Sequence, residues 1–179
     1  MEQLLLHICC GPDLTYAYEY FSKNYDIIGC FVNDNIDSEE EFEKRYLQSE
    51  IVSKHYGFNL IKLKYDNARF MNEINGLENE KEQGKRCEIC HRLNFEKTIE
   101  KAKQMNIKKV STTLTISPHK NVDMINRVGR RVAEERGIDF IEEILRKNNG
   151  FLRSIEISKK LNLYRQNWCG CKFSRGYIG

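Results

Sequence analysis

A short apolar run near the start of the chain, residues 4–8, is followed by Cys9, Cys10, a Gly-Pro pair and Asp13. Successive apolar residues are typical of a strand that is buried on both faces of a parallel sheet. The residues after Asp13 follow a helical pattern, so the cysteines come where a strand passes into a helix. In open α/β sheets, ligands bind at the carboxyl ends of the strands. This stretch therefore predicts an α/β fold with two thiols at its ligand-binding edge.

The rest of the chain alternates between strand and helix patterns. Further strands are expected over residues 27–32, 60–63, 109–114 and 138–141, and helices over residues 14–21, 38–57, 88–105, 121–136 and 151–161. Such alternation implies right-handed crossovers and a parallel sheet. In a Rossmann-like order the first and fourth strands are neighbours, and the loops over residues 9–13 and 115–120 then flank one crevice. The irregular residues 66–86 are long enough for a lid or a binding segment.

The composition is that of an ordinary globular protein, with 40% hydrophobic and 31% charged residues. A length of 179 residues predicts a single α/β domain over residues 1–179. No apolar run approaches the roughly 20 residues that span a bilayer, and the N-terminus lacks signal-peptide features, so we expect a cytoplasmic protein without a membrane partner. Cysteines there are mostly reduced, so the seven in this chain favour metal binding or redox chemistry over structural disulfides.

Four of the cysteines form two close pairs, Cys9-Cys10 and Cys87-x-x-Cys90. The second pair has a spacing that can bind zinc, bind a cluster or form a redox disulfide. Together the pairs supply four thiolates, the number needed by a Cys₄ zinc site or a [4Fe–4S] cluster. Adjacent ligands are awkward for one tetrahedral zinc but can reach different irons, so the spacing favours iron–sulfur. The alternative is that Cys9 and Cys10 are simply buried at the end of a strand.

Asp13 has two interpretations. Aspartate at the first position of a helix is a good N-cap, and the residues alone favour that role. Because Asp13 is three residues from Cys10, it could instead hold a second metal or deliver a proton.

The segment Cys169-Gly170-Cys171 is too tightly spaced for two ligands of an ordinary metal site. Such a pair can close a strained and therefore oxidising disulfide, which favours a redox pair over free surface thiols. The nearby basic residues would lower the thiol pKa values; they are Arg165, Lys172 and Arg175.

Of three other reactive side chains, two have more ordinary explanations and the third is left open. Cys30 lies in an apolar strand and is expected to behave as a small buried hydrophobe. His7 lies within a buried strand and is more often a hydrogen-bonded core histidine than a ligand. His119 lies in a loop, where it could donate to a substrate or a phosphate, and the sequence leaves its role open.

Charge is distributed unevenly, with −7 over residues 1–100 and +10 over residues 101–179. A basic half indicates a polyanionic partner, although a solvated surface rich in Lys and Glu gives the same balance. Near the C-terminus aromatic and basic residues interleave, which suits stacking on unpaired bases beside phosphate contacts. These residues are Tyr164, Arg165, Trp168, Lys172, Arg175 and Tyr177. The alternative is that the aromatic rings pack against the domain.

Four motifs, in order along the chain, resemble those of one known family. They are LLLHICCGP over residues 4–12, GKRCEICHRL over residues 84–93, TTLTISPHK over residues 112–120 and LYRQNWCGC over residues 163–171. The second-strand loop over residues 33–36, together with Tyr46, is also similar. The family is QueH, the non-cobalamin epoxyqueuosine reductases, and the resemblance runs nearly end to end.

The resemblance implies an oxidoreductase that acts in tRNA processing, in the last step of queuosine biosynthesis. In that step the epoxide oxygen of epoxyqueuosine is removed reductively at the wobble position of tRNA. The resemblance also implies a Rossmann-like fold related to the adenine nucleotide α-hydrolases (HUP), but the chain lacks their phosphate-binding signature. ATP is therefore not expected, and the resemblance to a non-cobalamin family implies that cobalamin is not used. The sequence does not identify the electron donor.

By position, the resemblance assigns Cys9, Cys10, Cys87 and Cys90 to a [4Fe–4S] cluster at the carboxyl ends of the strands, and Cys169 and Cys171 to a redox-active pair that forms a disulfide bond. Asp13 would help to hold an additional mononuclear iron, and Asp13 or His119 would supply a proton. Substrate binding would fall to Ser117, Lys120, Arg165 and Trp168, the last two in the basic C-terminal segment. Two rival functions remain, a zinc-bound tRNA-binding module and a metal-free thiol–disulfide oxidoreductase.

Overall fold

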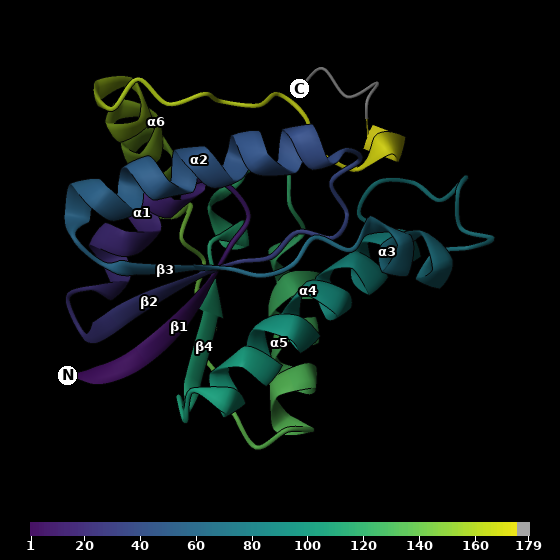
Figure 1. The fold of residues 1–179 in the computed structure, drawn as a ribbon, viewed down its shortest axis with the longest axis horizontal. Helices are drawn as coiled ribbons and strands as arrows, with labels where there is room; N and C mark the ends of the chain where they lie inside the picture. Colours follow the sequence, from purple (N-terminus) through teal and green to yellow (C-terminus); the bar gives the residue numbers. More distant parts are fainter. Residues whose placement is uncertain (175–179) are drawn as a thin grey trace.

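The computed structural model describes residues 1–174, so Arg175 and Tyr177 lie outside the described residues. Its centre is a five-stranded parallel sheet in the order β3-β2-β1-β4-β5 (Figure 1). The strands are β1 (Glu2–Ile8), β2 (Tyr25–Phe31), β3 (Asn59–Lys62), β4 (Lys109–Thr112) and β5 (Asp139–Phe140). The predicted Rossmann-like sheet is confirmed, because β1 pairs with both β2 and β4.

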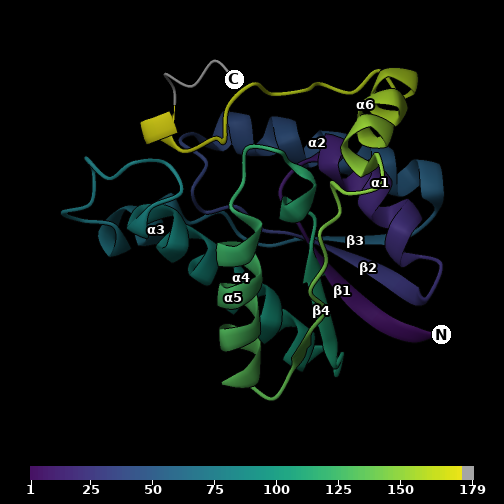
Figure 2. The ribbon, with the colours of Figure 1, turned by 180° about the vertical axis from the view of Figure 1, so that it is seen from behind.

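Helices cover both faces of the sheet. On one face lie α1 (Gly11–Phe21), α2 (Glu39–Tyr56) and α6 (Gly150–Lys160), and on the other lie α4 (Lys85–Gln104) and α5 (Val122–Glu134) (Figures 1 and 2). Successive side chains of β1 point to opposite faces. Leu4, Leu6 and Ile8 therefore pack into the core beneath α1 and α2, whereas Leu5 packs into the core beneath α4 and α5. The predicted burial of this strand on both faces is confirmed.

Several element boundaries differ from the sequence prediction by one to three residues, and two of these differences lie near the cysteines and the loop after β4. β4 ends at Thr112, two residues before the predicted end, because the chain turns there into a short 3₁₀ helix, η1 (Leu114–Ile116). α4 begins at Lys85, three residues before the predicted start, so Cys87 and Cys90 lie in its first two turns. α3 (Asn67–Glu73) occupies the beginning of the irregular stretch.

The predicted ends of α2 are confirmed. The Ser38 side chain accepts a hydrogen bond from the Glu41 N–H at 3.2 Å, as an N-cap residue does. Gly57 ends the helix with a left-handed φ of 76°. Among residues 1–174, no helix is long and apolar enough to cross a membrane.

The segment after α6 runs back past α2 toward α3 (Figure 2). It is held to the loop after β2, where Asp37 N–H donates to Gly170 O at 2.8 Å. Gly170 has a φ of 108°, and a Cβ there would lie 3.0 Å from both Arg45 Nη1 and Ile36 Cγ1. This position therefore favours glycine both by its backbone conformation and by its close approach to α2.

Gly170→Ala is expected to lower the free energy of unfolding more than Gly57→Ala does. Both positions have positive φ, which costs an L-residue about 1–2 kcal/mol, but the space around Gly57 is open. At Gly170 the added methyl group also overpacks the contact with α2, which costs a further ~1–3 kcal/mol. Urea unfolding of both variants measures the difference, and equal losses would show that α2 does not constrain Gly170.

Candidate active site

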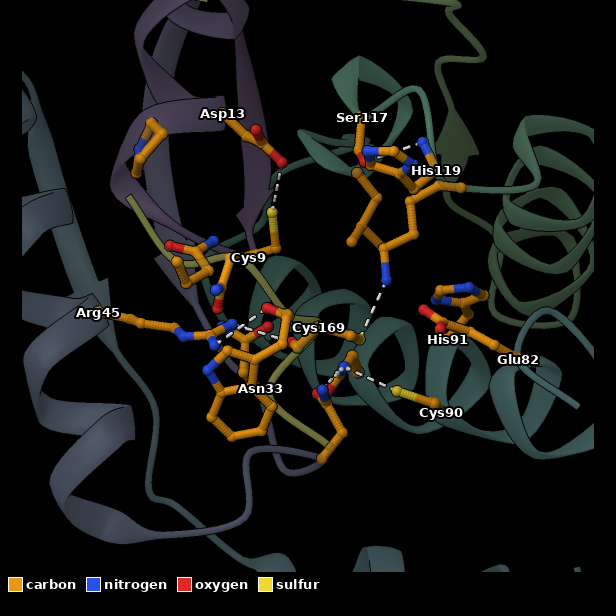
Figure 3. A pocket seen from close by; sticks show the side chains of 18 of the residues that line it. Cys9, Asp13, Asn33, Arg45, Glu82, Cys90, His91, Ser117, His119 and Cys169 are labelled. Carbon is orange, nitrogen blue, oxygen red and sulfur yellow. Dashed lines mark hydrogen bonds between the residues drawn. The ribbon is translucent and has the colours of Figure 1, made fainter. Parts of the chain in front are cut away.

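A cavity of about 460 Å³ opens at the carboxyl ends of β1 and β4 (Figure 3). Its lining comes from the β1–α1 junction, the loop after β2, α4, the loop after η1 and the segment after α6. Nine of the residues singled out from the sequence line it: Cys9, Asp13, Cys90, Ser117, His119, Lys120, Arg165, Trp168 and Cys169. The expected crevice between the first and fourth strands is therefore present.

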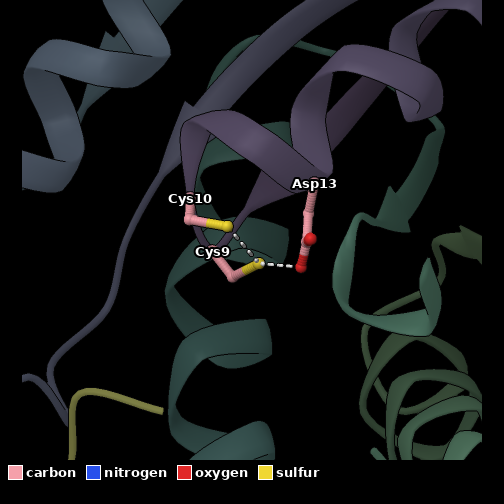
Figure 4. Close-up of side chains that lie close together, drawn as sticks. All are labelled: Cys9, Cys10 and Asp13. Atoms are coloured by element: carbon pink, nitrogen blue, oxygen red, sulfur yellow. Dashed lines mark hydrogen bonds between the residues drawn. The ribbon is translucent and has the colours of Figure 1, made fainter. Parts of the chain in front are cut away.

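Cys9, Cys10 and Asp13 form the tightest group of potential metal ligands (Figure 4). Their ligand atoms all lie within 4.8 Å of one another. Cys9 Sγ lies 3.7 Å from Cys10 Sγ and donates to Asp13 Oδ2 at 3.2 Å. The strand ends just before Cys9 and the helix begins just after Cys10, so the turn between them brings the two thiols together.

The interpretation of Asp13 as a helix cap is wrong. The N-cap of α1 is Cys10, which has extended backbone dihedrals, and Asp13 is the third helical residue. Its carboxylate instead faces Cys9. Burial raises the pKa of Asp13 to about 6, against the opposing effects of the hydrogen bond from Cys9 and the charge of Lys120.

Cys87 and Cys90 lie outside this group among the residues that the structure describes. Cys87 Sγ accepts a hydrogen bond from Gln83 N–H at 3.2 Å, and Asn94 Nδ2 lies 3.8 Å from Cys90 Sγ. Cys90 faces the same cavity as Cys9, from α4 (Figure 3). Burial raises the pKa of the Cys90 thiol well above its usual range, so a thiolate at this position requires a nearby positive charge.

Cys169 is paired with a lysine. Lys120 Nζ lies 3.0 Å from Cys169 Sγ, although the two residues are 49 positions apart. Burial disfavours the Cys169 thiolate, but the charges of Lys120 and Arg45 outweigh it, so the pKa of Cys169 is lowered. The sequence predicts Arg165, Lys172 and Arg175 as the basic neighbours, whereas the structure pairs Cys169 with Lys120.

Cys171 has a different environment from Cys169. Its side chain packs in a small apolar cluster with Phe70, Ile74 and Leu93, and burial raises its pKa to about 11. Both thiols are free in this structure. The pKa values of the two thiols are therefore shifted in opposite directions, and of the two only Cys169 lines the cavity.

Arg45 is a second cationic neighbour of Cys169, and the sequence analysis does not predict it. It is almost fully buried, and its guanidinium donates to Cys169 O at 2.9 Å and to Trp168 O at 3.3 Å, while Glu41 neutralises it at 2.7 Å. The guanidinium carbon of Arg45 lies over the Trp168 ring, 5.2 Å from the centroid of that ring. A signal was available, because Arg45 falls on the inner face of its helix, between Phe42 and Ser49.

The predictions for Cys30, His7 and His119 have different outcomes in the structure. Cys30 is fully buried on β2, as predicted. His7 is confirmed as a core histidine, because Nε2 donates to Val32 O at 3.0 Å and Nδ1 lies 2.9 Å from Thr112 Oγ1. Burial lowers its pKa to about 4. His119 is exposed at the edge of the cavity, where its role stays a prediction.

Lys120→Met is expected to raise the pKa of Cys169, because the substitution removes the ammonium that stabilises the thiolate. Thiolates are the reactive form, so the pH midpoint for iodoacetamide labelling of Cys169 should move upward. At neutral pH the labelling rate should fall roughly tenfold for each unit that the pKa rises. Peptide-resolved mass spectrometry measures it, and Lys172→Met is the matched control because Lys172 is exposed. An unchanged midpoint would show that Lys120 does not set this pKa.

Comparison with known proteins gives a consistent result. The sequence model described as epoxyqueuosine reductase QueH matches residues 4–176. Proteins with that same name are 34% identical in Streptococcus pyogenes serotype M1 and 33% identical in Thermotoga maritima, each over 177 residues. These matches cover 96% and 97% of this chain, and 69% and 91% of the respective relatives. Since the match spans the strands, the residues that line the cavity and the cysteines, this chain belongs to the epoxyqueuosine reductase QueH family.

Proposed function

We propose that this protein is a cytoplasmic oxidoreductase that reduces epoxyqueuosine to queuosine at the wobble position of tRNA. Family membership supports the reaction class, and the name of each relative above is that of an epoxyqueuosine reductase. The observation that carries the proposal is a single cavity that joins the Cys9-Cys10-Asp13 group to the Lys120–Cys169 pair. Potential metal ligands and a redox-competent thiol then face the same substrate.

The donor set fits an iron–sulfur site. Thiolates are the ligands that iron–sulfur clusters use, and the Cys9, Cys10 and Asp13 ligand atoms already lie within 4.8 Å of one another. We assign Cys9, Cys10, Cys87 and Cys90 to a [4Fe–4S] cluster, with the hard Asp13 carboxylate suited to an additional iron. When bound, these irons would supply single electrons and a Lewis acid for the epoxide oxygen.

The Cys169/Cys171 dithiol can balance the reaction. Removing the epoxide oxygen leaves an alkene and water, and it takes two electrons and two protons. Oxidation of the Cys169 thiolate and the Cys171 thiol to a disulfide releases two electrons and one proton, and Asp13 or His119 supplies the second proton. Lys120 holds the Cys169 thiolate, and an external electron donor reduces the disulfide for the next turnover.

The net positive charge of residues 101–179 favours binding to the negatively charged tRNA. Arg165 is exposed and lines the cavity, so it is placed to contact a phosphate beside the modified nucleotide. Trp168 is half-buried over Arg45 and also lines the cavity, where one face of its ring can stack on a base. Ser117 and Lys120 line the cavity as well.

The test uses anaerobically purified protein and tRNA that carries epoxyqueuosine. We expect a coloured protein that contains iron and sulfide and that converts the nucleoside to a product lacking one oxygen atom, detected by mass spectrometry of digested tRNA. Stoichiometric zinc in a colourless, inactive protein would indicate a tRNA-binding module instead. Turnover of a dithiol substrate by metal-free protein, without loss of the epoxide oxygen, would indicate a thiol–disulfide oxidoreductase.

A further inference from the structure

The same cavity contains polar atoms that the protein itself does not satisfy. Within residues 1–174, four buried side-chain nitrogen or oxygen atoms lack a hydrogen-bond partner. Three of them belong to residues that line this cavity: Glu82 Oε2, His91 Nδ1 and Gln166 Oε1. Buried polar atoms in folded proteins are nearly always hydrogen-bonded. Their concentration in one cavity therefore indicates a ligand that supplies the missing partners.

The three atoms come from separate parts of the chain. Glu82 lies in the loop before α4, His91 lies on α4, and Gln166 lies in the segment after α6. Glu82 and His91 lie on the same side of the cavity as Cys90 (Figure 3). Glu82 is also near enough to Cys169 for its negative charge to oppose that thiolate. A ligand that forms hydrogen bonds with these atoms would therefore lie beside Cys169, whose sulfur contacts Lys120.

The chemistry of the three atoms defines what the ligand must present. A carboxylate oxygen accepts only, an amide oxygen accepts, and a neutral imidazole nitrogen accepts or donates. The ligand must therefore carry at least two donors, one of them preferably a cation for Glu82. The side chain of epoxyqueuosine has one secondary amine, protonated near neutral pH, and two ring hydroxyls.

We propose, on the basis of the proposed function, that these atoms bind the epoxycyclopentane side chain of the substrate. Glu82 Oε2 accepts from the protonated secondary amine, and Gln166 Oε1 and His91 Nδ1 bind the two ring hydroxyls. The amine nitrogen is bonded directly to the cyclopentane ring, so its contact with Glu82 keeps the epoxide within the cavity that Cys9, Asp13 and Cys169 line. Glu82 and Gln166 are then residues that determine specificity for the modified nucleoside.

The test compares three forms of one tRNA bound to the holoenzyme. The wobble nucleotide is epoxyqueuosine, 7-aminomethyl-7-deazaguanosine, which has an amine without the ring, or guanosine, which has neither. Glu82→Gln should weaken binding of both amine-bearing tRNAs about tenfold or more, and leave the guanosine form unchanged. Gln166→Leu should weaken only the epoxyqueuosine form, by about two- to tenfold, whereas Gln166→Glu, which keeps an acceptor, should not.

Controls separate this inference from folding and from the proposed function. Glu78→Gln makes the same charge change in the same loop, outside the cavity lining, and should leave all three affinities unchanged. The iron content and unfolding midpoint of each variant should match those of the parent. If Glu82→Gln weakens binding of the guanosine tRNA as much as binding of the amine-bearing tRNAs, or weakens binding of none of the three tRNAs, the inference is overturned. If the parent protein does not remove the epoxide oxygen, the proposed function itself fails, whatever the affinities.

Discussion

Cys10→Ala is expected to abolish both the visible absorption of the purified protein and its reductase activity. Cys10 is buried at the N-cap of α1, with its sulfur 3.7 Å from that of Cys9. Loss of this thiolate leaves three cysteines for a cluster that takes four. Iron and sulfide assays, the visible spectrum and activity on tRNA carrying epoxyqueuosine measure the result. Cys90→Ala should behave in the same way, because it removes the ligand expected from α4.

Cys30→Ala is the matched control for these substitutions. It removes the same sulfur atom from a fully buried cysteine, but on β2, away from the cavity. It should lower the free energy of unfolding by about 1 kcal/mol and leave iron, colour and activity in place. If Cys90→Ala also kept its colour and activity, the assignment of α4 to the cluster would be wrong.

Cys169→Ser is expected to stop multiple turnover without removing the metal. A serine hydroxyl neither ionises near neutral pH nor forms a disulfide, so the electron pair that we assign to Cys169 and Cys171 could not be delivered. Iron content should stay at the level of the parent protein, because Cys169 is not among the assigned ligands. Product formed per protein, measured over time with a reductant in excess, is the direct readout.

Cys171→Ser should show the same loss of turnover, because it removes the other cysteine of the proposed disulfide. It should also leave the Cys169 thiolate available for labelling, because Lys120, rather than Cys171, stabilises it. Normal turnover by the Cys169→Ser protein would rule out the dithiol as the source of electrons, while leaving the cluster assignment intact.

Local pattern was sufficient for the sheet and for most helix ends. The apolar run over residues 4–8, the capping pair Ser38 and Glu41, and Gly57 each depend on neighbours a few residues away. The proximity of β1 and β4 followed from the predicted Rossmann-like strand order and was also correct. The predicted site residues mostly line one cavity because they follow strands whose carboxyl ends share an edge.

Local pattern was not sufficient for the partners of individual site residues. Aspartate near a helix start is usually a cap, and only the packed structure shows that Cys10 occupies the cap position while Asp13 faces a thiol. The Lys120–Cys169 contact joins residues 49 positions apart. Arg45 contacts Trp168 and Cys169 more than 120 residues further along the chain.

The sequence by itself determined the order of strands and helices, the edge at which the thiols collect and the family to which the chain belongs. These properties depend on periodicity and on motifs, which are local. Only the tertiary structure decided that Lys120 pairs with Cys169, that Arg45 holds the C-terminal segment, and that Glu82, His91 and Gln166 face one cavity with unsatisfied polar atoms. Such pairings depend on how distant segments pack, because burial fixes which polar groups must satisfy one another or a ligand.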